Sequence, residues 1–384
     1  MKKLLLLISL IFPVLTNAQS KKPAPSTFDV LIGTYTNGTS TSKGIYVYRF
    51  YEDRGTLSYL NEFTNIDDST FTNPSYLCVA DNNHFIYAVN ENNVGGVTAL
   101  TFDANTGKMK LINKRPSAGA DPCYISVDKD QKNIFVANYT SGSLSVFPLN
   151  KDGSMGAMSQ NIQDSGSSVV KDRQQGPHVH TAVLAPNEKY LLYTDLGTDK
   201  LNIERYHASK PQPLSPVTPA FASVTPGNGP RHVAFSADGK HLYLLQEIGG
   251  IINTYDYDNG TLKQTQSVDM KVPAFNGNIG SAAIKISPDG RFLYASNRGN
   301  ANDIVVYAIN QDNGQLTFVS RAPSSGKGPR DFAIDPSGKY LLVANQNSNS
   351  IFVYKIDQTT GRLIGFVSHL EIGSPVCLKI VPAE

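Results

Sequence analysis

The sequence predicts an all-β fold, and three observations lead to that prediction. Apolar and polar residues alternate over short stretches such as IYVYRF and IVVYAI, which is the two-residue period of a strand. Turn signals such as ADGK, SPDG and PSGK separate these stretches at short intervals. The whole pattern also recurs with a period of about 50 residues, while helical periodicity is almost absent. These observations together predict a chain built from repeated β units.

Each repeat reads as four strands. The fullest copy is GPRHVAFSADGKHLYLLQE…IINTYDYDNGTLKQTQSV, in which an apolar strand, a turn, a Tyr- and Leu-rich strand, an alternating strand and a fourth strand follow one another. Copies begin at Pro74, Pro122, Val179, Pro230, Ser281 and Pro329. A Gly-x-Leu/Met signal for the fourth strand lies at Gly55, Gly107, Gly153, Gly260, Gly314 and Gly361. A single four-stranded unit cannot bury both of its faces, so the units are expected to stack in a ring as a β-propeller.

The two ends of the chain complete this ring. The segment from Phe28 begins directly with a second-strand pattern, VLIGTYT, and the C-terminal stretch SPVCLKIVPAE is a lone first strand. Joined, they form one further blade. The sequence therefore predicts a seven-bladed β-propeller of four-stranded blades over residues 28–384, with the C-terminal strand joining the N-terminal blade.

The N-terminus has the pattern of an export signal. Two lysines precede a 12-residue apolar run, Leu4–Leu15, and Thr16 and Ala18 supply the small residues of a cleavage site. We interpret residues 1–18 as a signal peptide and residues 19–27 as a flexible tail. The mature protein is then expected in the periplasm or outside the cell, with no membrane attachment.

Composition excludes several other classes. The formal net charge is +2 and no basic run lies beyond the tail, so nucleic acid is not an expected partner. Three cysteines, Cys78, Cys123 and Cys377, are too few for a disulfide framework and are expected to be buried thiols. His178 and His180 form an isolated HxH pair without further ligands, so neither a metal nor a cofactor is predicted. A monomer is expected.

The repeat register places titratable residues at one end of the channel. In a propeller the first strand of each blade lines the channel, and the second runs back antiparallel to it. The start of strand one and the end of strand two therefore share a face. Arg231 and its equivalents His180 and Arg330 begin first strands, so they are predicted to point into one channel mouth.

The ends of the second strands give a second ring at the same face. Its pairs are Asn90-Glu91, Asn138-Tyr139, Asp195-Leu196, Gln246-Glu247, Asn297-Arg298 and Asn345-Gln346, with Thr34-Tyr35 as the seventh. The polar first members either bond the framework or contact a ligand. The second members differ in chemistry from blade to blade, which favours function. The candidate substrate-binding residues are His178, Arg330, Asn138, Tyr139, Asp195, Gln246, Asn297, Asn345, Gln346 and Glu91.

The mouth thus gathers groups suited to an anion and to proton transfer. Arginine presents a planar fork that fits carboxylate or phosphate, and histidine with a carboxylate can move protons near neutral pH. The alternative is a plain network of ion pairs. Elsewhere, His232 is expected to turn between blades, and Asp238, Asp289 and Asp335 are expected to form turns. The polar loop Asn161–Gln175 is consistent with a flexible insertion.

Four longer motifs stand out in the chain: GPHVHTAVLAPNEKYLLYTDLGTDKL, GPRHVAFSADGKHLYLLQE, SNRGNANDIVVY and GPRDFAIDPSGKYLLVANQNSNSI. They resemble the seven-bladed propeller lactonases, a family that includes bacterial 6-phosphogluconolactonases and the fungal carboxymuconate-lactonising enzyme. The resemblance extends from Phe28 to Pro382. It implies that the family's active-site His, Arg, Glu and Arg fall on His180, Arg231, Glu247 and Arg298.

The resemblance implies a metal-free hydrolase for a sugar lactone, of the 6-phosphogluconolactonase type, with a small anionic lactone as substrate. Glu247 or His180 would be the general base, while Arg231 and Arg298 would hold the oxyanion and the anionic group, helped by Arg330. The predicted export signal is unexpected for such an enzyme, because 6-phosphogluconolactone is made inside the cell. Two alternatives therefore stay open: an exported lactonase or cycloisomerase for another anionic lactone, and a non-catalytic propeller that binds a glycan or a protein.

Overall fold

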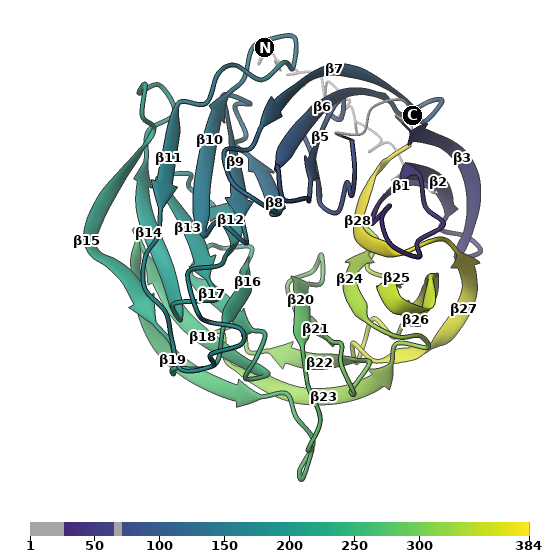
Figure 1. The fold of residues 1–384 in the computed structure, drawn as a ribbon. Coiled ribbons are helices and arrows are strands. Elements are labelled where there is room, and N and C mark those ends of the chain that lie inside the picture. Colours follow the sequence, from purple (N-terminus) through teal and green to yellow (C-terminus); the bar gives the residue numbers. More distant parts are fainter. Residues whose placement is uncertain (1–26, 65–70, 384) are drawn as a thin grey trace, which may run out of the picture.

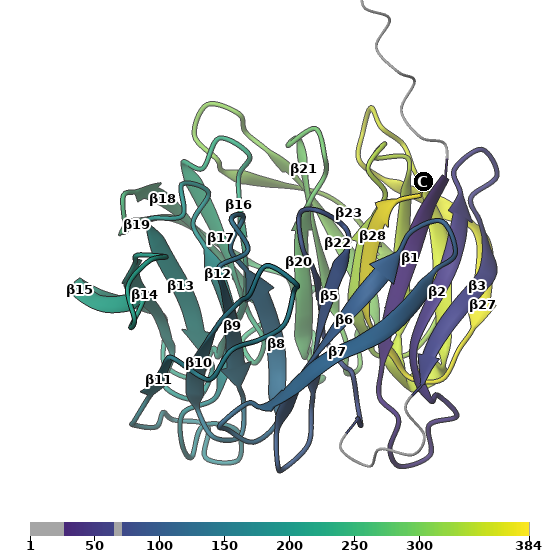
Figure 2. The same ribbon diagram turned by 90° about the horizontal axis from the view of Figure 1, so that it is seen from above.

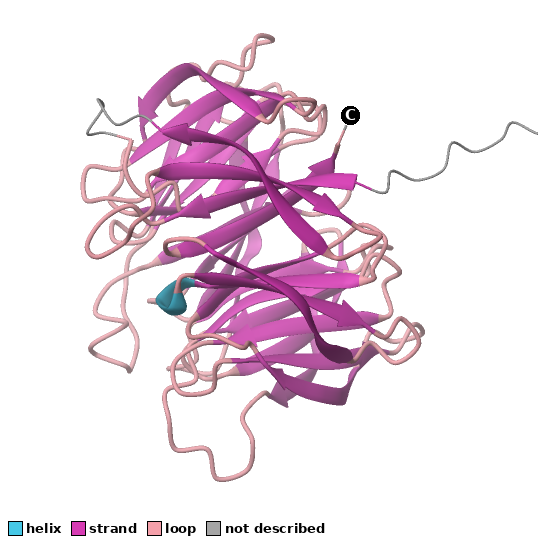
Figure 3. Cartoon of the chain, turned by 90° about the vertical axis from the view of Figure 1, so that its right-hand side faces the viewer, coloured by secondary structure: helices cyan, strands magenta, loops and turns pink. Residues whose placement is uncertain are grey.

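The computed structural model describes residues 27–64 and 71–383 and confirms the predicted fold. Seven antiparallel four-stranded sheets surround a central channel as the blades of a propeller (Figure 1). In the described part of the chain, helix is confined to the single 3₁₀ turn η1 (Gln346–Ser348) (Figure 3). The predicted signal peptide and residues 19–26 of the tail lie outside the described residues. Thr27, predicted as the last tail residue, begins the first strand.

Blade 1 consists of β28 (Pro375–Pro382), β1 (Thr27–Thr34), β2 (Gly44–Tyr51) and β3 (Thr56–Thr64). Blade 2 consists of β4 (Leu77–Val79), β5 (Phe85–Asn90), β6 (Gly96–Asp103) and β7 (Lys108–Pro116). Blade 3 consists of β8 (Pro122–Val127), β9 (Asn133–Asn138), β10 (Ser143–Pro148) and β11 (Gln160–Gln163). Blade 4 consists of β12 (Val179–Leu184), β13 (Tyr190–Asp195), β14 (Lys200–Tyr206) and β15 (Leu214–Ser223).

Blade 5 consists of β16 (Pro230–Phe235), β17 (His241–Gln246), β18 (Ile251–Asp258) and β19 (Thr261–Asp269). Blade 6 consists of β20 (Ser281–Ile286), β21 (Phe292–Asn297), β22 (Asp303–Ile309) and β23 (Leu316–Pro323). Blade 7 consists of β24 (Pro329–Ile334), β25 (Tyr340–Asn345), β26 (Ser350–Ile356) and β27 (Leu363–Glu371).

The two ends of the chain close the ring, as predicted. Strand β28 pairs antiparallel with β1, from Phe28 opposite Pro382 to Thr34 opposite Pro375. Figure 1 shows β28 and β1 side by side at the inner side of blade 1, and Figure 2 shows the same pair from above. Blade 1 therefore takes its innermost strand from the C-terminus and its other three strands from the N-terminus.

The hydrophobic core lies between the blades. Leu192 and Ile203 of blade 4, for example, pack in one buried cluster with Leu244 and Tyr255 of blade 5. The other clusters likewise join residues of neighbouring blades. The stacking that the repeat predicted thus buries both faces of each sheet.

The turn predictions hold with one exception. The fourth strand begins within two residues of five of the six glycine signals. Gly361 shows why glycine is used there: its φ is +73°, and a Cβ would lie 2.4 Å from the Phe292 ring of the neighbouring blade 6. The prediction from Gly153 is wrong, because Met155 forms only an isolated bridge to Leu149 and β11 begins at Gln160.

A β-bulge at the start of the first strand sets the functional residues apart from the ladder. In blade 5, Pro230 pairs with Gln246 and His232 with Leu245, which leaves Arg231 without a partner. The same shift isolates His180 in blade 4 and Arg330 in blade 7. A bulge redirects the side chain of its extra residue and is often found next to active sites.

Candidate active site

Glu247 is the electrostatic centre of the site. It follows β17 and accepts a 2.6 Å hydrogen bond from Arg173 Nη2 at its Oε1. Its Oε2 lies 2.8 Å from Arg231 Nε and 3.0 Å from Arg298 Nη2, two ion pairs in which the N–H groups are not aligned as hydrogen bonds. Burial alone would raise the pKa of Glu247, but the three guanidinium groups hold it well below its ordinary value. The carboxylate is therefore ionised, and both of its oxygens contact guanidinium groups.

His180 is a buried imidazole with an unused nitrogen. The residue is only 4% exposed, and its ring packs edge-on against Tyr139 and His232 at centroid distances of 5.7 and 5.2 Å. Its Nδ1 has no hydrogen-bond partner among the described residues. Burial and then the charge of Arg231 lower the pKa of His180 well below its ordinary value. The imidazole is consequently neutral at neutral pH.

Tyr139 links the histidine side of the mouth to Arg173. Its ring stacks on His178 at 4.4 Å, and its carbonyl oxygen lies 3.0 Å from His178 Nδ1. Arg173 Nη2 donates to the Tyr139 hydroxyl at 3.4 Å as well as to Glu247. His178 and Tyr139 therefore form a wall that supports both Arg173 and His180.

A second carboxylate, Glu91, lies across the mouth. It accepts a 2.7 Å hydrogen bond from the Tyr35 hydroxyl and another from the hydroxyl of Ser75. The Arg330 guanidinium lies over the Tyr35 ring at 5.3 Å and 3.9 Å from the carboxylate of Glu91. This half of the site holds its carboxylate mainly with hydroxyl groups, whereas Glu247 is held by three guanidinium groups.

Residues in or just before the first strands of six blades line a narrow cavity in the channel. It has a volume of about 10 Å³, which is room for about one water molecule. Its lining residues are Ser75, Tyr76, Cys123, His180, Arg231, His232, Arg330, Asp331 and Val376. The structure thus brings His180, Arg231 and Arg330 together around one channel, where the repeat register placed them. A sugar-sized ligand can only sit above this constriction, at the mouth.

The polar residues that end the second strand of each blade are different, because their side chains lie inside the blades. Asn138 Nδ2 donates to Ser143 Oγ and Ser145 Oγ, and Asn297 bonds Ser281 and Asp303. Asp195 accepts from the backbone N–H of His178. Gln246 and Asn345 are likewise fully buried at their strand ends. Of the candidate binding residues, these five are therefore not brought to the mouth.

Gln346 is a further candidate, and it follows β25 as Glu247 follows β17. It begins η1, and its backbone N–H donates to Gly328 O. No hydrogen bond joins its side chain to Glu91, Glu247 or the arginines in the described chain.

All three cysteines are free thiols. Cys123 and Cys377 are buried as predicted, whereas Cys78 is only partly buried.

Two sequence interpretations need correction. The loop after β11 is more than an insertion, since it delivers Arg173 to Glu247. The only sequence signal was the long spacing from Pro122 to the next repeat. His232 does not turn between blades: its ring contacts Tyr76, Tyr124 and His180. The bulge at Arg231 interrupts the alternation of the strand, so two successive residues face the channel.

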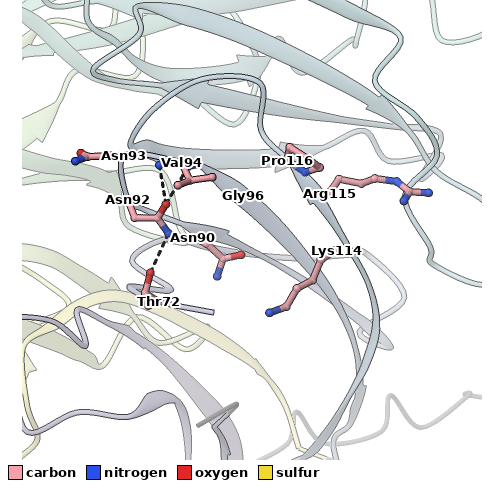
Figure 4. Close-up of a pocket in the computed structure, with 10 residues that line it drawn as sticks. Thr72, Asn90, Asn92, Asn93, Val94, Gly96, Lys114, Arg115 and Pro116 are labelled. Carbon is pink, nitrogen blue, oxygen red and sulfur yellow. Dashed lines mark hydrogen bonds between the residues drawn. The ribbon is translucent and has the colours of Figure 1, made fainter. Parts of the chain in front are cut away.

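A wider hollow of about 580 Å³ lies beside blade 2 (Figure 4). Its polar groups already hold the local structure: Asn92 bonds Thr72 and the backbone of Val94, and Arg115 Nε donates to the carbonyl oxygens of Met155 and Gly156. Its lining contains neither an imidazole nor a carboxylate. We therefore assign the chemistry to the charged mouth rather than to this hollow.

Fold and site together define a propeller whose channel mouth gathers arginine, histidine and glutamate side chains. The chain belongs to the lactonase family of seven-bladed β-propellers, whose family model matches residues 29–380. It is 36% identical to a 6-phosphogluconolactonase of Formosa agariphila over 91% of this chain and 99% of that protein. It is 32% identical to a 6-phosphogluconolactonase of Bacillus subtilis over 91% of this chain and 97% of that protein.

A solved structure gives the same result in three dimensions. The periplasmic gluconolactonase of Pseudomonas aeruginosa matches with a TM-score of 0.88 and 37% identity, covering 94% of this chain and all of that one. Within residues 27–64 and 71–383 we find no group of three or more His, Cys, Asp or Glu residues that could hold a metal ion. No helix in those residues is long and apolar enough to cross a membrane.

Proposed function

We propose that this protein hydrolyses a sugar lactone at the channel mouth, with 6-phosphoglucono-1,5-lactone as the substrate. The observation that carries the proposal is the buried, neutral His180, whose Nδ1 has no partner in the described chain while it lies beside a cluster of guanidinium groups. A buried polar atom without a partner is costly, so such an atom is typical of a group that waits for a ligand.

His180 is the general base of this proposal. Its neutral imidazole takes a proton from water as the hydroxide adds to the lactone carbonyl carbon. The carbonyl oxygen becomes an oxyanion beside Arg231, which lines the narrow cavity, and Arg298, which shares the Glu247 carboxylate with Arg231. The ring C–O bond then breaks, and the proton on His180 passes to the leaving ring oxygen. The water molecule thereby supplies its OH to the new carboxyl group and its remaining proton to the new hydroxyl group.

Glu247 is an anchor for the arginines in this scheme. Its two oxygens are already shared among Arg173, Arg231 and Arg298, and its pKa is lowered, so it is a weak base. A carboxylate in this position fixes the guanidinium groups in place before substrate arrives, which is the preorganisation that oxyanion stabilisation needs. These contacts favour His180 over Glu247 as the general base of the proposal.

The export signal predicted for residues 1–18 leads us to propose that the reaction takes place outside the cytoplasm. The similarity to a periplasmic gluconolactonase supports that location. Purified mature protein should therefore be assayed on both 6-phosphogluconolactone and gluconolactone, with spontaneous hydrolysis subtracted. Turnover of either lactone that falls by about 10²–10⁴ in His180→Asn supports the proposal. No turnover of any lactone by the parent protein would refute it and favour a ligand-binding propeller.

A further inference from the structure

Arg173 reaches the mouth on a loop that is firmly attached to the propeller. Gln174 beside it is fully buried, donates from Nε2 to Leu196 O at 2.8 Å and accepts from the backbone N–H of Val170 at 3.1 Å. At the start of the loop, Asp164 accepts a 2.9 Å hydrogen bond from the Tyr193 hydroxyl. The loop therefore holds Arg173 at the mouth rather than leaving it in solvent.

Arg173 is nevertheless the arginine that can exchange its partner most easily. Its side chain is 39% exposed, against 2% for Arg231, 19% for Arg298 and 17% for Arg330. If Arg173 releases Glu247, the carboxylate keeps its two other ion pairs, with Arg231 and Arg298. A guanidinium at the outer edge of the mouth can thus turn to a ligand without leaving a buried charge alone.

The charge balance of the mouth calls for such a ligand. Four guanidinium groups face two carboxylates, and His180 is neutral. The cluster formed by Arg173, Arg231, Arg298, Arg330, Glu91 and Glu247 therefore carries two more positive than negative charges, although each arginine contacts a carboxylate. The oxyanion that develops on a lactone carbonyl supplies only one negative charge. A substrate that balances the mouth carries a second one elsewhere.

We propose that Arg173 binds an anionic group, phosphate or carboxylate, that the substrate carries outside its lactone ring, and that it thereby selects charged over uncharged lactones. This inference rests on the proposed lactone hydrolysis and adds the residue that sets the substrate class. Arg173 leaves Glu247 as the substrate enters and forms a forked contact to the anion. No bond of the substrate changes at this position.

The test is the substrate preference of Arg173→Met. Loss of a hydrogen-bonded charge contact should lower kcat/KM for 6-phosphogluconolactone by about ten- to a hundredfold, mainly through KM. The value for uncharged gluconolactone should fall clearly less than that for 6-phosphogluconolactone, because Glu247 keeps its ion pairs with Arg231 and Arg298. A lactone bearing a carboxylate in place of the phosphate distinguishes the two anions: a parallel fall indicates a general anion site, and no fall indicates a phosphate site. Arg173→Lys, which keeps the charge, should retain part of the preference.

Lys171→Met is the matched control, because Lys171 is an exposed cation of the same loop. It should leave the preference unchanged. Equal losses on charged and uncharged lactones in Arg173→Met would overturn the inference, since Arg173 would then act only through Glu247. If the parent protein turns over no lactone, the proposed function fails separately. Calorimetry can still test the anion site by measuring the affinities of the parent protein and Arg173→Met for 6-phosphogluconate and for gluconate. If the ratio of these two affinities is the same in both proteins, the anion site is refuted.

Discussion

Arg231 Nε lies 2.8 Å from Glu247 Oε2, and both residues stand at the same end of the β16–β17 hairpin. Arg231 is the bulged residue at the start of β16, and Glu247 directly follows β17. Arg231 also donates to Ala282 O of blade 6, so the pair ties two blades together at the channel. The residues that we assign to oxyanion binding are thus also part of the framework.

This double role predicts that Glu247→Gln destabilises the fold as well as the reaction. The variant leaves Arg173, Arg231 and Arg298 without their carboxylate. Removal of one member of a buried ion pair typically lowers the free energy of unfolding by about 3–5 kcal/mol. Denaturant unfolding of both proteins measures the difference. Asp130→Asn is the control, because Asp130 and its partner Lys132 are both exposed, so the change should cost less than about 1 kcal/mol. Equal effects in the two variants would contradict the prediction.

The lowered pKa of His180 predicts a lactonase that stays active in mild acid. Burial and the nearby Arg231 charge favour the neutral imidazole, so the base stays unprotonated below the ordinary histidine pKa of 6.5. The acid limb of kcat/KM, which reports the free enzyme, should therefore lie below pH 6.5. The measurement is kcat/KM between pH 4.5 and 8 with spontaneous hydrolysis subtracted. An acid limb at or above pH 6.5 would show that His180 is not the neutral base proposed.

Closure by β28 predicts that the C-terminal strand is indispensable. Deletion of residues 374–384 removes every partner of the inner edge of β1 and takes Cys377, Leu378 and Val381 out of the core. We expect loss of cooperative unfolding or a strongly lowered Tm by calorimetry. A shorter deletion of residues 383–384 keeps β28 whole and is the control. A long deletion that melts like the parent would rule out this closure as the source of stability.

Sequence periodicity predicted this fold well because every blade is the same four-stranded unit, which must bury both of its faces against its neighbours. The apolar strands, the glycine turns and the unmatched ends fixed the number of blades, and the register placed His180, Arg231 and Arg330 around one channel. Strict alternation then misplaced His232, since a bulge is invisible in a pattern of period two. Arg173 was missed for another reason: its loop belongs to no repeat, so only tertiary contacts place it beside Glu247.

The same loop predicts a pH-dependent stability that Asp164→Asn should remove. Burial, the charge of Asp195 and a hydrogen bond with it raise the pKa of Asp164 from 3.8 to about 7. The folded protein thus holds a proton that the unfolded chain releases above about pH 4. The stability that goes with this proton is fully present below pH 4 and is lost as the pH rises through about 7.

Asparagine is uncharged at every pH, so the Tm of Asp164→Asn relative to the parent should be higher at pH 8 than at pH 5. Asp172→Asn, in an exposed position of the same loop, is the control and should show no such change. Calorimetric scans of the three proteins at both pH values measure the effect. If the Tm difference between Asp164→Asn and the parent were the same at pH 5 and pH 8, Asp164 would already be ionised in the folded state. Its contact with Asp195 would then have to be stabilised by a cation, and Lys200 is the nearby candidate.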